Sequence, residues 1–128
     1  MKIESYRLRS MPSAQCHVEI ERIPFDGCVG AGRLSAITLV SYRTPIIRFA
    51  IDKYANVELK VLYPVDCSRT TARHVNRFTS EFLGENWYYD LKKLYSDGAG
   101  QSVNITHLLY YIADSAQWYE HNGKKFHY

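Results

Sequence analysis

The 128-residue sequence contains no apolar run close to the roughly 20 residues that a membrane-spanning helix requires. Its first residues, Met1 to Arg7, include an early acid and lack the apolar core of a signal peptide. Hydrophobic residues make up 46% and charged residues 23%, which is ordinary globular usage and argues against disorder of the whole chain. We therefore expect a cytoplasmic protein with a single domain, residues 1–128, built around one core.

Cysteine is scarce, and the three cysteines Cys16, Cys28 and Cys67 are scattered. An odd, scattered set favours reduced thiols over a disulfide framework. Structural zinc needs paired ligands at short spacing, and that pattern is missing. Cys16 and His17 are adjacent, so in a strand they would point to opposite faces, and neither they nor the late histidines His121 and His127 form such a set. The sequence predicts no metal and no other cofactor.

A strong excess of one charge is also missing, because the formal net charge is only +3 at pH 7. A DNA mimic would have to be strongly acidic to present a phosphate-like field, so that class of protein is excluded. Nucleic-acid-binding domains are usually more basic than this chain. The charge therefore permits nucleic-acid binding without requiring it.

Glycine is concentrated in one segment, Asp26 to Arg33. This segment lacks the Gly-Lys-Ser/Thr ending of a phosphate-binding loop and the spacing of a dinucleotide fingerprint. The residues after it, Leu34 to Val40, are typical of a strand and not of the helix that a phosphate loop requires. The segment is predicted to be a flexible hairpin connection.

Alternation of apolar and polar residues predicts a run of strands in the N-terminal half. The expected strands are Ile3–Leu8, His17–Ile23, Leu34–Tyr42, Ile46–Ile51 and Val57–Tyr63, with Asp52 to Asn56 as a hairpin turn. We therefore predict an α+β fold. An antiparallel sheet of about four or five strands would pack against two or three helices from the C-terminal half.

The first helix should follow Pro64, with Ser68 as its N-cap, or Asp66 in another register, and Gly84 at its C-cap. Its apolar stripe recurs at helical spacing and comprises Thr71, Val75, Phe78 and Phe82. Glu85 to Tyr95 fits either a short helix or a connector. A final helix should be capped by Asn104 and end at Gly123, followed by a loose tail, with Ile105, Leu108, Leu109, Ile112 and Ala116 turned inward.

Three arginines, Arg69, Arg73 and Arg77, recur every four residues on the first predicted helix, with His74 and Lys60 nearby. Arginines at this spacing would contact successive phosphates or an acidic groove on a protein. The alternative is a solvated helix face on which Arg77 pairs with Glu81 four residues later.

Aromatic residues are abundant, with eleven tyrosines in the chain. Tyrosine is enriched in contact surfaces, although it also favours strands and fills small cores. On the final helix, Tyr111, Asp114 and Trp118 share the face opposite the apolar stripe, which indicates either a contact patch or a second buried face. The predicted binding residues are Arg69, Arg73, Arg77, His74, Tyr88, Tyr89, Tyr111 and Trp118.

Cys67 and His74 invite a catalytic interpretation, because Cys67 lies at the predicted helix N-terminus, where a thiol pKa is lowered. Along a helix the two residues are about 10 Å apart, too far for a direct hydrogen bond. A nucleophile and its base must be in contact. No catalytic residue is therefore predicted.

The pattern Ser41-Tyr42-x-Thr44-Pro45-Ile46, followed by Ser68-x-Thr70-Thr71-x-Arg73-His74, resembles a family of small, mostly uncharacterised proteins of bacteriophages and other mobile elements. The likeness covers Ser41 to Phe82, and the flanking parts of the chain do not share it. The resemblance implies a phage product that acts inside a bacterial host cell. It brings no activity and no catalytic residue with it.

Three hypotheses of function remain open. The first is a non-enzymatic inhibitor, of the anti-CRISPR or another anti-defence kind, that binds a host protein or nucleoprotein complex such as a CRISPR effector. The second is a nucleic-acid-binding phage regulator, whose affinity would fall steeply with salt. The third is a small nuclease or transferase that uses His74 and Arg73.

Overall fold

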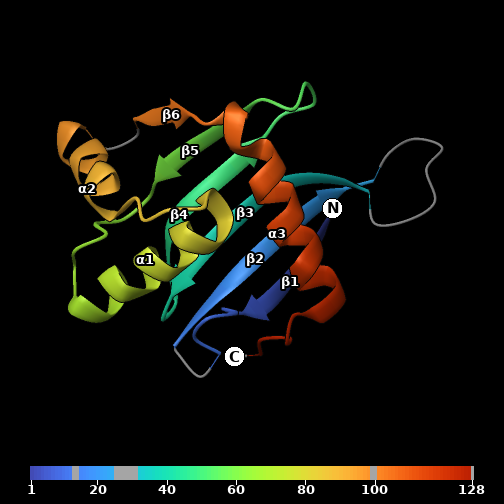
Figure 1. Cartoon of the computed structure of the whole chain (residues 1–128), viewed down its shortest axis with the longest axis horizontal. Coiled ribbons are helices and arrows are strands. Elements are labelled where there is room, and N and C mark those ends of the chain that lie inside the picture. The colour runs from blue at the N-terminus through green and yellow to red at the C-terminus, as the bar shows by residue number, and fades with distance from the viewer. Residues whose placement is uncertain (13–14, 25–31, 99–100, 128) are drawn as a thin grey trace.

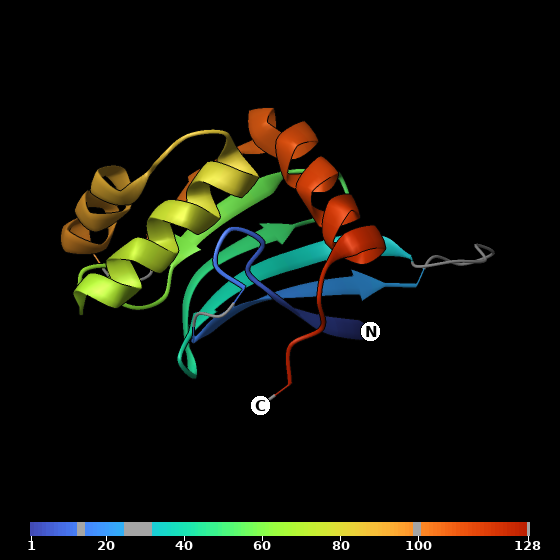
Figure 2. The ribbon, with the colours of Figure 1, turned by 60° about the horizontal axis from the view of Figure 1, so that its bottom comes forward.

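The computed structural model describes residues 1–12, 15–24, 32–98 and 101–127. Within them, six strands form one antiparallel sheet in which the strands lie side by side in sequence order. The helices cover one face of this sheet, as the two views in Figures 1 and 2 show. The predicted α+β class is confirmed, with five strands in the N-terminal half and a sixth between the helices.

The first five strands agree with their predicted bounds to within two residues. They are β1 (Lys2–Arg7), β2 (Cys16–Ile23), β3 (Arg33–Ser41), β4 (Thr44–Ile51) and β5 (Val57–Val61). The later elements are α1 (Arg69–Leu83), α2 (Tyr88–Asp97), β6 (Ser102–Asn104), a 3-10 turn η1 (Thr106–Leu108) and α3 (Leu109–Asn122). No helix in the described ranges is long and apolar enough to cross a bilayer.

Alternate residues of each strand face the helices, and this side of the sheet is apolar. Two buried rows of paired residues cross β2 to β5 there: Val18, Leu39, Ile47 and Val61, and Ile20, Ile37, Phe49 and Leu59. Between them, on the opposite face, lies the polar row Glu19, Thr38, Arg48 and Lys60. The core therefore lies between the sheet and the helices.

A chain of aromatic rings crosses this core from the sheet to the C-terminal helix. Phe49 lies against Phe78 with ring centroids 5.2 Å apart, and Phe78 against Phe82 at 4.8 Å. Phe82 in turn stacks on Tyr119 at 5.7 Å, and Tyr119 contacts Tyr6 at 5.8 Å. These contacts hold β4, α1, α3 and β1 in one packed unit.

Helix α1 begins and ends as the sequence predicts. The Oγ atom of Ser68 accepts a hydrogen bond from the backbone N–H of Thr71 at 3.0 Å, which is the geometry of an N-cap. Gly84 follows the helix with φ of 80°, in the left-handed region that favours glycine. The predicted stripe is buried, and it comprises Thr71, Val75, Phe78 and Phe82.

The structure resolves one open alternative and corrects the start of the final helix. Residues 88–97 form α2, which turns Leu91 into the core. The final helix begins later than predicted, because Ser102 to Asn104 pair with β5 as strand β6. Asn104 is therefore not the cap of a helix, and its Oδ1 accepts a hydrogen bond from the N–H of Thr106 at 3.0 Å. Gly123 ends α3 as predicted.

The expectation of a loose tail after Gly123 is wrong for residues 124–127. The N–H of Arg7 donates to the carbonyl of Lys124 at 2.8 Å, and the N–H of Phe126 donates to the carbonyl of Ser5 at 2.9 Å. The Phe126 ring also stacks on His17, with centroids 4.3 Å apart. These bonds close the outer edge of β1, whose backbone groups would otherwise be unpaired. Of the predicted glycine-rich connection, only Gly32 and Arg33 belong to the described residues.

Candidate contact surface

Arg69, Arg73 and Arg77 lie along the exposed side of α1, and we call these three residues the arginine ridge. A step of four residues advances a helix by about 6 Å, so the three side chains leave the helix at regular intervals on nearly one line. Among the described residues, none of the three makes an ion pair. The ridge therefore presents three positive charges that no described acidic residue neutralises.

Glu81, the predicted partner of Arg77, turns to the other side of α1. Its carboxylate accepts a hydrogen bond from the hydroxyl of Tyr119 at 3.1 Å, and Ser10 lies 3.5 Å from it. Burial in this position raises the pKa of Glu81. The expected pair between Arg77 and Glu81 is therefore not formed.

His74 does not lie on the arginine ridge, although it was predicted to belong to the same contact surface. Consecutive helical residues point about 100° apart, which turns this ring inward, where it is fully buried. Its Nδ1 lies 2.9 Å from the Oγ of Ser41, and Ser41 lies 3.2 Å from the hydroxyl of Thr71. Thr71 in turn accepts from Ser68 at 3.1 Å. Burial, and secondarily the charge of Arg73, lower the pKa of His74.

This hydrogen-bonded chain joins the β3–β4 hairpin to the first turn of α1. It connects the two parts of the sequence pattern on which the phage-family resemblance rests. At the tip of the hairpin, Tyr42 has a positive φ of 59° and is 51% exposed. Its ring centroid lies 6.1 Å from that of His74, so Tyr42 lies beside the N-terminal half of α1. No local pattern in the sequence predicts this placement of Tyr42, because it depends on how the hairpin packs against α1.

Tyr111 lies at the opposite end of α1. It is 54% exposed, and a methyl group added at Gly84 would lie 4.0 Å from its ring. The structure thus brings this predicted contact residue to the C-terminal end of the helix that carries the arginine ridge. Exposed tyrosines therefore lie near both ends of α1.

The remaining predicted aromatics lie on other elements. Tyr88 and Tyr89 belong to α2, and their rings meet edge to face at 5.3 Å. Tyr89 is exposed, whereas Tyr88 packs partly against the core. In Figure 1, α2 lies on the side of α1 opposite to α3.

Trp118 is half-buried, and the guanidinium of Arg9 lies 4.2 Å from its ring centre. It lines a cavity of about 260 Å³ together with Arg9, Ser10, Glu81, Ser115 and Tyr119. One face of the indole is therefore already used within the domain, in a cation–π contact.

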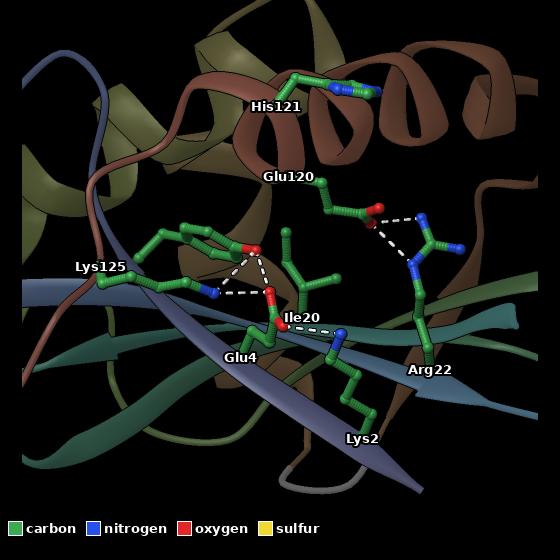
Figure 3. Close-up of a pocket in the computed structure, with 8 residues that line it drawn as sticks. Lys2, Glu4, Ile20, Arg22, Glu120, His121 and Lys125 are labelled. Atoms are coloured by element: carbon green, nitrogen blue, oxygen red, sulfur yellow. Dashed lines mark hydrogen bonds and ion pairs between the residues drawn. The ribbon is translucent and has the colours of Figure 1, made fainter. Parts of the chain in front are cut away.

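A second cavity, of about 360 Å³, lies between β1, β2 and the C-terminal end of α3, and it is rich in charge (Figure 3). Glu4 lies at its centre, where it accepts hydrogen bonds from Tyr6 and from Lys125 at 2.7 Å and pairs with Lys2 at 2.9 Å. Hydrogen bonds from Lys125, Tyr6 and Lys2 lower the pKa of Glu4 to about 2.

Beside this group, the Nε of Arg22 donates to Glu120 at 2.7 Å. Each carboxylate of the cavity is thus paired with a cation of the same domain. The cavity therefore fits a structural joint that holds residues 124–127 and α3 against β1 and β2 better than it fits a binding site.

Cys67 and His74 do not form a pair of nucleophile and base in the structure. Cys67 is exposed beside the N-cap of α1, while His74 is buried against Ser41. No group of three or more metal-ligating side chains gathers among the described residues. What the geometry offers is a rigid basic surface with exposed aromatic side chains near it.

Comparisons with protein-family models, with curated proteins and with solved structures find no match for this chain. The likeness of Ser41 to Phe82 to a family of phage proteins therefore stays a prediction.

Proposed function

We propose that this protein acts by binding, as a non-enzymatic phage-encoded inhibitor that docks on a host defence protein or nucleoprotein complex, in the manner of an anti-CRISPR protein. The observation that carries the proposal is the arginine ridge, whose three exposed charges have no acidic partner among the described residues. The bacterial and phage context comes from the sequence resemblance alone.

The physical form of the ridge suits a contact surface. Arginine is the cation most often used at interfaces, because its planar guanidinium binds carboxylates and phosphates with two parallel hydrogen bonds. The ridge stands on a helix that is capped at both ends and fixed to the sheet by a buried stripe. A partner would therefore meet side chains on a backbone that is already ordered, which lowers the entropy lost on binding.

Nucleic-acid binding is the second candidate. The exposed rings of Tyr42, beside the N-terminal half of α1, and of Tyr111, beside its C-terminal end, favour it. Bases stack on such rings while arginines contact the phosphates. A small nuclease or transferase is the weakest candidate. His74, the residue it would use, has no exposed surface.

The experiment is a phage plating assay on bacterial strains that each carry one defence system, CRISPR–Cas systems among them. Expression of the protein should raise the plating efficiency of the targeted phage on at least one strain. The variant Arg73→Glu/Arg77→Glu should lose this effect, because it reverses two of the three ridge charges. Lys60 lies in the polar row on the opposite face of the sheet, and not near the ridge as predicted. Lys53→Glu/Lys60→Glu therefore makes the same change in net charge away from α1 and should retain the effect.

The target is then captured from that strain with and without nuclease treatment. A protein partner that survives nuclease and is lost with Arg73→Glu/Arg77→Glu supports inhibition by contact. Loss of every partner on nuclease treatment, with a log–log salt slope of up to about −3 for three phosphate contacts, favours the nucleic-acid regulator. Two results contradict the proposal. One is that expression of the protein changes the plating efficiency of the phage on no strain, and the other is that both double variants are equally active.

A further inference from the structure

The two outer edges of the sheet differ. The edge of β1 is closed by the backbone bonds of residues 124–126, whereas β6 is the last strand on the other side. The N–H of Ile105 donates to the carbonyl of Val57 at 2.8 Å. Since hydrogen-bonded pairs alternate along an antiparallel ladder, Val103 also directs its backbone groups to β5, while those of Ser102 and Asn104 point outward. Within the described residues, no strand pairs with that outer edge.

A groove of about 360 Å³ accompanies this open edge. It lies between α2 and β6 and is lined by Glu85, Trp87, Asp90, Leu91, Leu94 and Val103. Figure 1 shows α2 beside the end of the sheet that β6 and β5 form. Val103 pairs with Leu59 of the buried apolar row, so its side chain is on the helix side of the sheet, and it remains 37% exposed. The groove thus offers apolar surface next to unpaired strand backbone.

The charge at this groove is opposite to that of the arginine ridge. Glu85 and Asp90 are both exposed, and neither makes an ion pair with another described residue. Of the two lysines of α2, Lys92 pairs with Asp66 at 3.7 Å, and Lys93 makes no ion pair with a described residue. The indole N–H of Trp87 is buried and has no acceptor among the described residues. The groove therefore combines an apolar floor with two carboxylates and a donor that is not used.

We propose that β6 and this groove form a second binding site, which takes an extended peptide segment of a partner protein as a seventh strand. An apolar side chain of the segment fills the groove against Leu94 and Val103. Lysine or arginine residues two positions away lie on the same face of the added strand and pair with Glu85 and Asp90. The unpaired N–H and C=O groups of Ser102 and Asn104 supply the backbone bonds.

This site goes beyond the proposed inhibitory function, because it uses other elements, the opposite charge and a different mode of recognition. Its occupant is identified by complementarity. An acidic segment would be repelled by the two carboxylates, and a purely apolar one would leave them desolvated without a partner. A second copy of this chain is the competing occupant.

The test is a titration of the isotope-labelled full chain with the acetylated and amidated peptide Thr-Lys-Thr-Leu-Thr-Lys-Thr, followed by NMR. In a strand, its two lysines and its leucine share one face, so all three meet the groove. Amide resonances of Ser102, Val103 and Asn104 and the indole resonance of Trp87 should shift with saturation. The peptide with glutamate in place of both lysines should cause no such shifts.

Two variants separate the parts of the proposal. Asp90→Lys should weaken binding about fivefold, because it replaces an exposed attraction by a repulsion. Its matched control is Asp114→Lys on α3, which makes the same charge change outside the groove and should bind as the wild type does. Ser102→Pro removes one outward N–H while leaving the ladder to β5, and it should abolish the shifts at Asn104.

Three results would overturn the proposal. One is the absence of shifts at millimolar peptide, and another is equal affinity of Asp90→Lys and Asp114→Lys for the peptide. The third is a dimer of the protein alone whose formation shifts the same amides, which would assign the edge to a second copy. If Ser102→Pro fails to fold, the comparison of Asp90→Lys with Asp114→Lys still decides.

Discussion

His74 is enclosed by the β3–β4 hairpin and by its own helix. Its Nδ1 has Ser41 as a partner, while its Nε2 is buried with no partner among the described residues. Protonation would place a positive charge, and an N–H without an acceptor, in this enclosed position beside Arg73. Folding therefore favours the neutral ring, in agreement with the lowered pKa of His74.

For His74 we predict a loss of stability in mild acid. Because the folded pKa of His74 lies below its ordinary value of 6.5, the unfolded chain binds the proton more readily. The free energy of unfolding should therefore fall as pH decreases below 6.5. The variant His74→Asn keeps an amide near Ser41 but does not titrate. It should cost on the order of 1 kcal/mol at pH 7 and show a shallower decline between pH 7 and 5.

The measurement is urea unfolding of both proteins at several pH values in this range. Glu4 does not interfere, because its stabilisation is lost only as pH falls below 4.5, toward its folded pKa of about 2. His17 is also buried with a lowered pKa, so part of the slope should remain. The raised pKa of Glu81 has the opposite effect, because it increases the free energy of unfolding as pH falls. This contribution is common to both proteins. Equal slopes of His74→Asn and the wild type would contradict the prediction.

For single residues, the sequence predicted the features that depend on neighbouring residues in the chain. Ser68 and Gly84 were identifiable as the caps of α1, because capping depends on the residue type and its immediate neighbours. Arg69, Arg73 and Arg77 were identifiable as one line, because their spacing matches the helix. His74 was grouped with them, although its burial depends on Ser41, which is 33 residues away and reaches it only through the fold.

Among the elements, the segment after Gly123 illustrates what local pattern could not show. Residues 124–127 have no alternation and no turn signal, yet they pair with β1 through two backbone hydrogen bonds. Strand β6 is similar, because three exposed residues carry almost no periodicity and its position is defined by pairing with β5. Edge pairing is a property of two segments, so it is not visible in either one.

We predict that deletion of the residues after Gly123 destabilises the domain and uncovers the edge of β1. The deletion removes both backbone bonds, the stack of Phe126 on His17 and the pair of Lys125 with Glu4. We expect a loss of about 2 kcal/mol in the free energy of unfolding. The uncovered edge of β1 should also promote self-association.

Chemical unfolding gives the first quantity, and sedimentation at increasing protein concentration gives the second. Phe126→Ala should reproduce about half of the stability loss, at about 1 kcal/mol, without opening the whole edge. His127→Ala, at an exposed position of the same segment, is the matched control and should change neither quantity. A truncated protein as stable and as monomeric as the wild type would show that residues 124–127 do not hold β1.

For the whole molecule, the decisive feature is that one core joins every layer. The buried cluster includes residues from β1, the central strands, α1, α2 and α3, and the ring chain from Phe49 to Tyr6 passes through Phe82. A core that is shared in this way makes it costly to unfold one part alone. The two contact surfaces, on α1 and between α2 and β6, would then stand on a single cooperative unit.

We therefore predict that both ends of the domain unfold in one and the same transition. Trp87 lies between α1 and α2, and Trp118 lies on α3, so Trp118→Phe leaves a reporter at one end and Trp87→Phe leaves one at the other. In each background, Phe82→Leu should cost about 1–2 kcal/mol and lower the fluorescence and circular dichroism midpoints equally, since Phe82 contacts both Phe78 and Tyr119.

If Trp87 instead reports an earlier transition than Trp118, α2 and β6 unfold separately. The groove between them would then be formed only while that local unit is folded, and peptide binding there should raise the Trp87 midpoint alone.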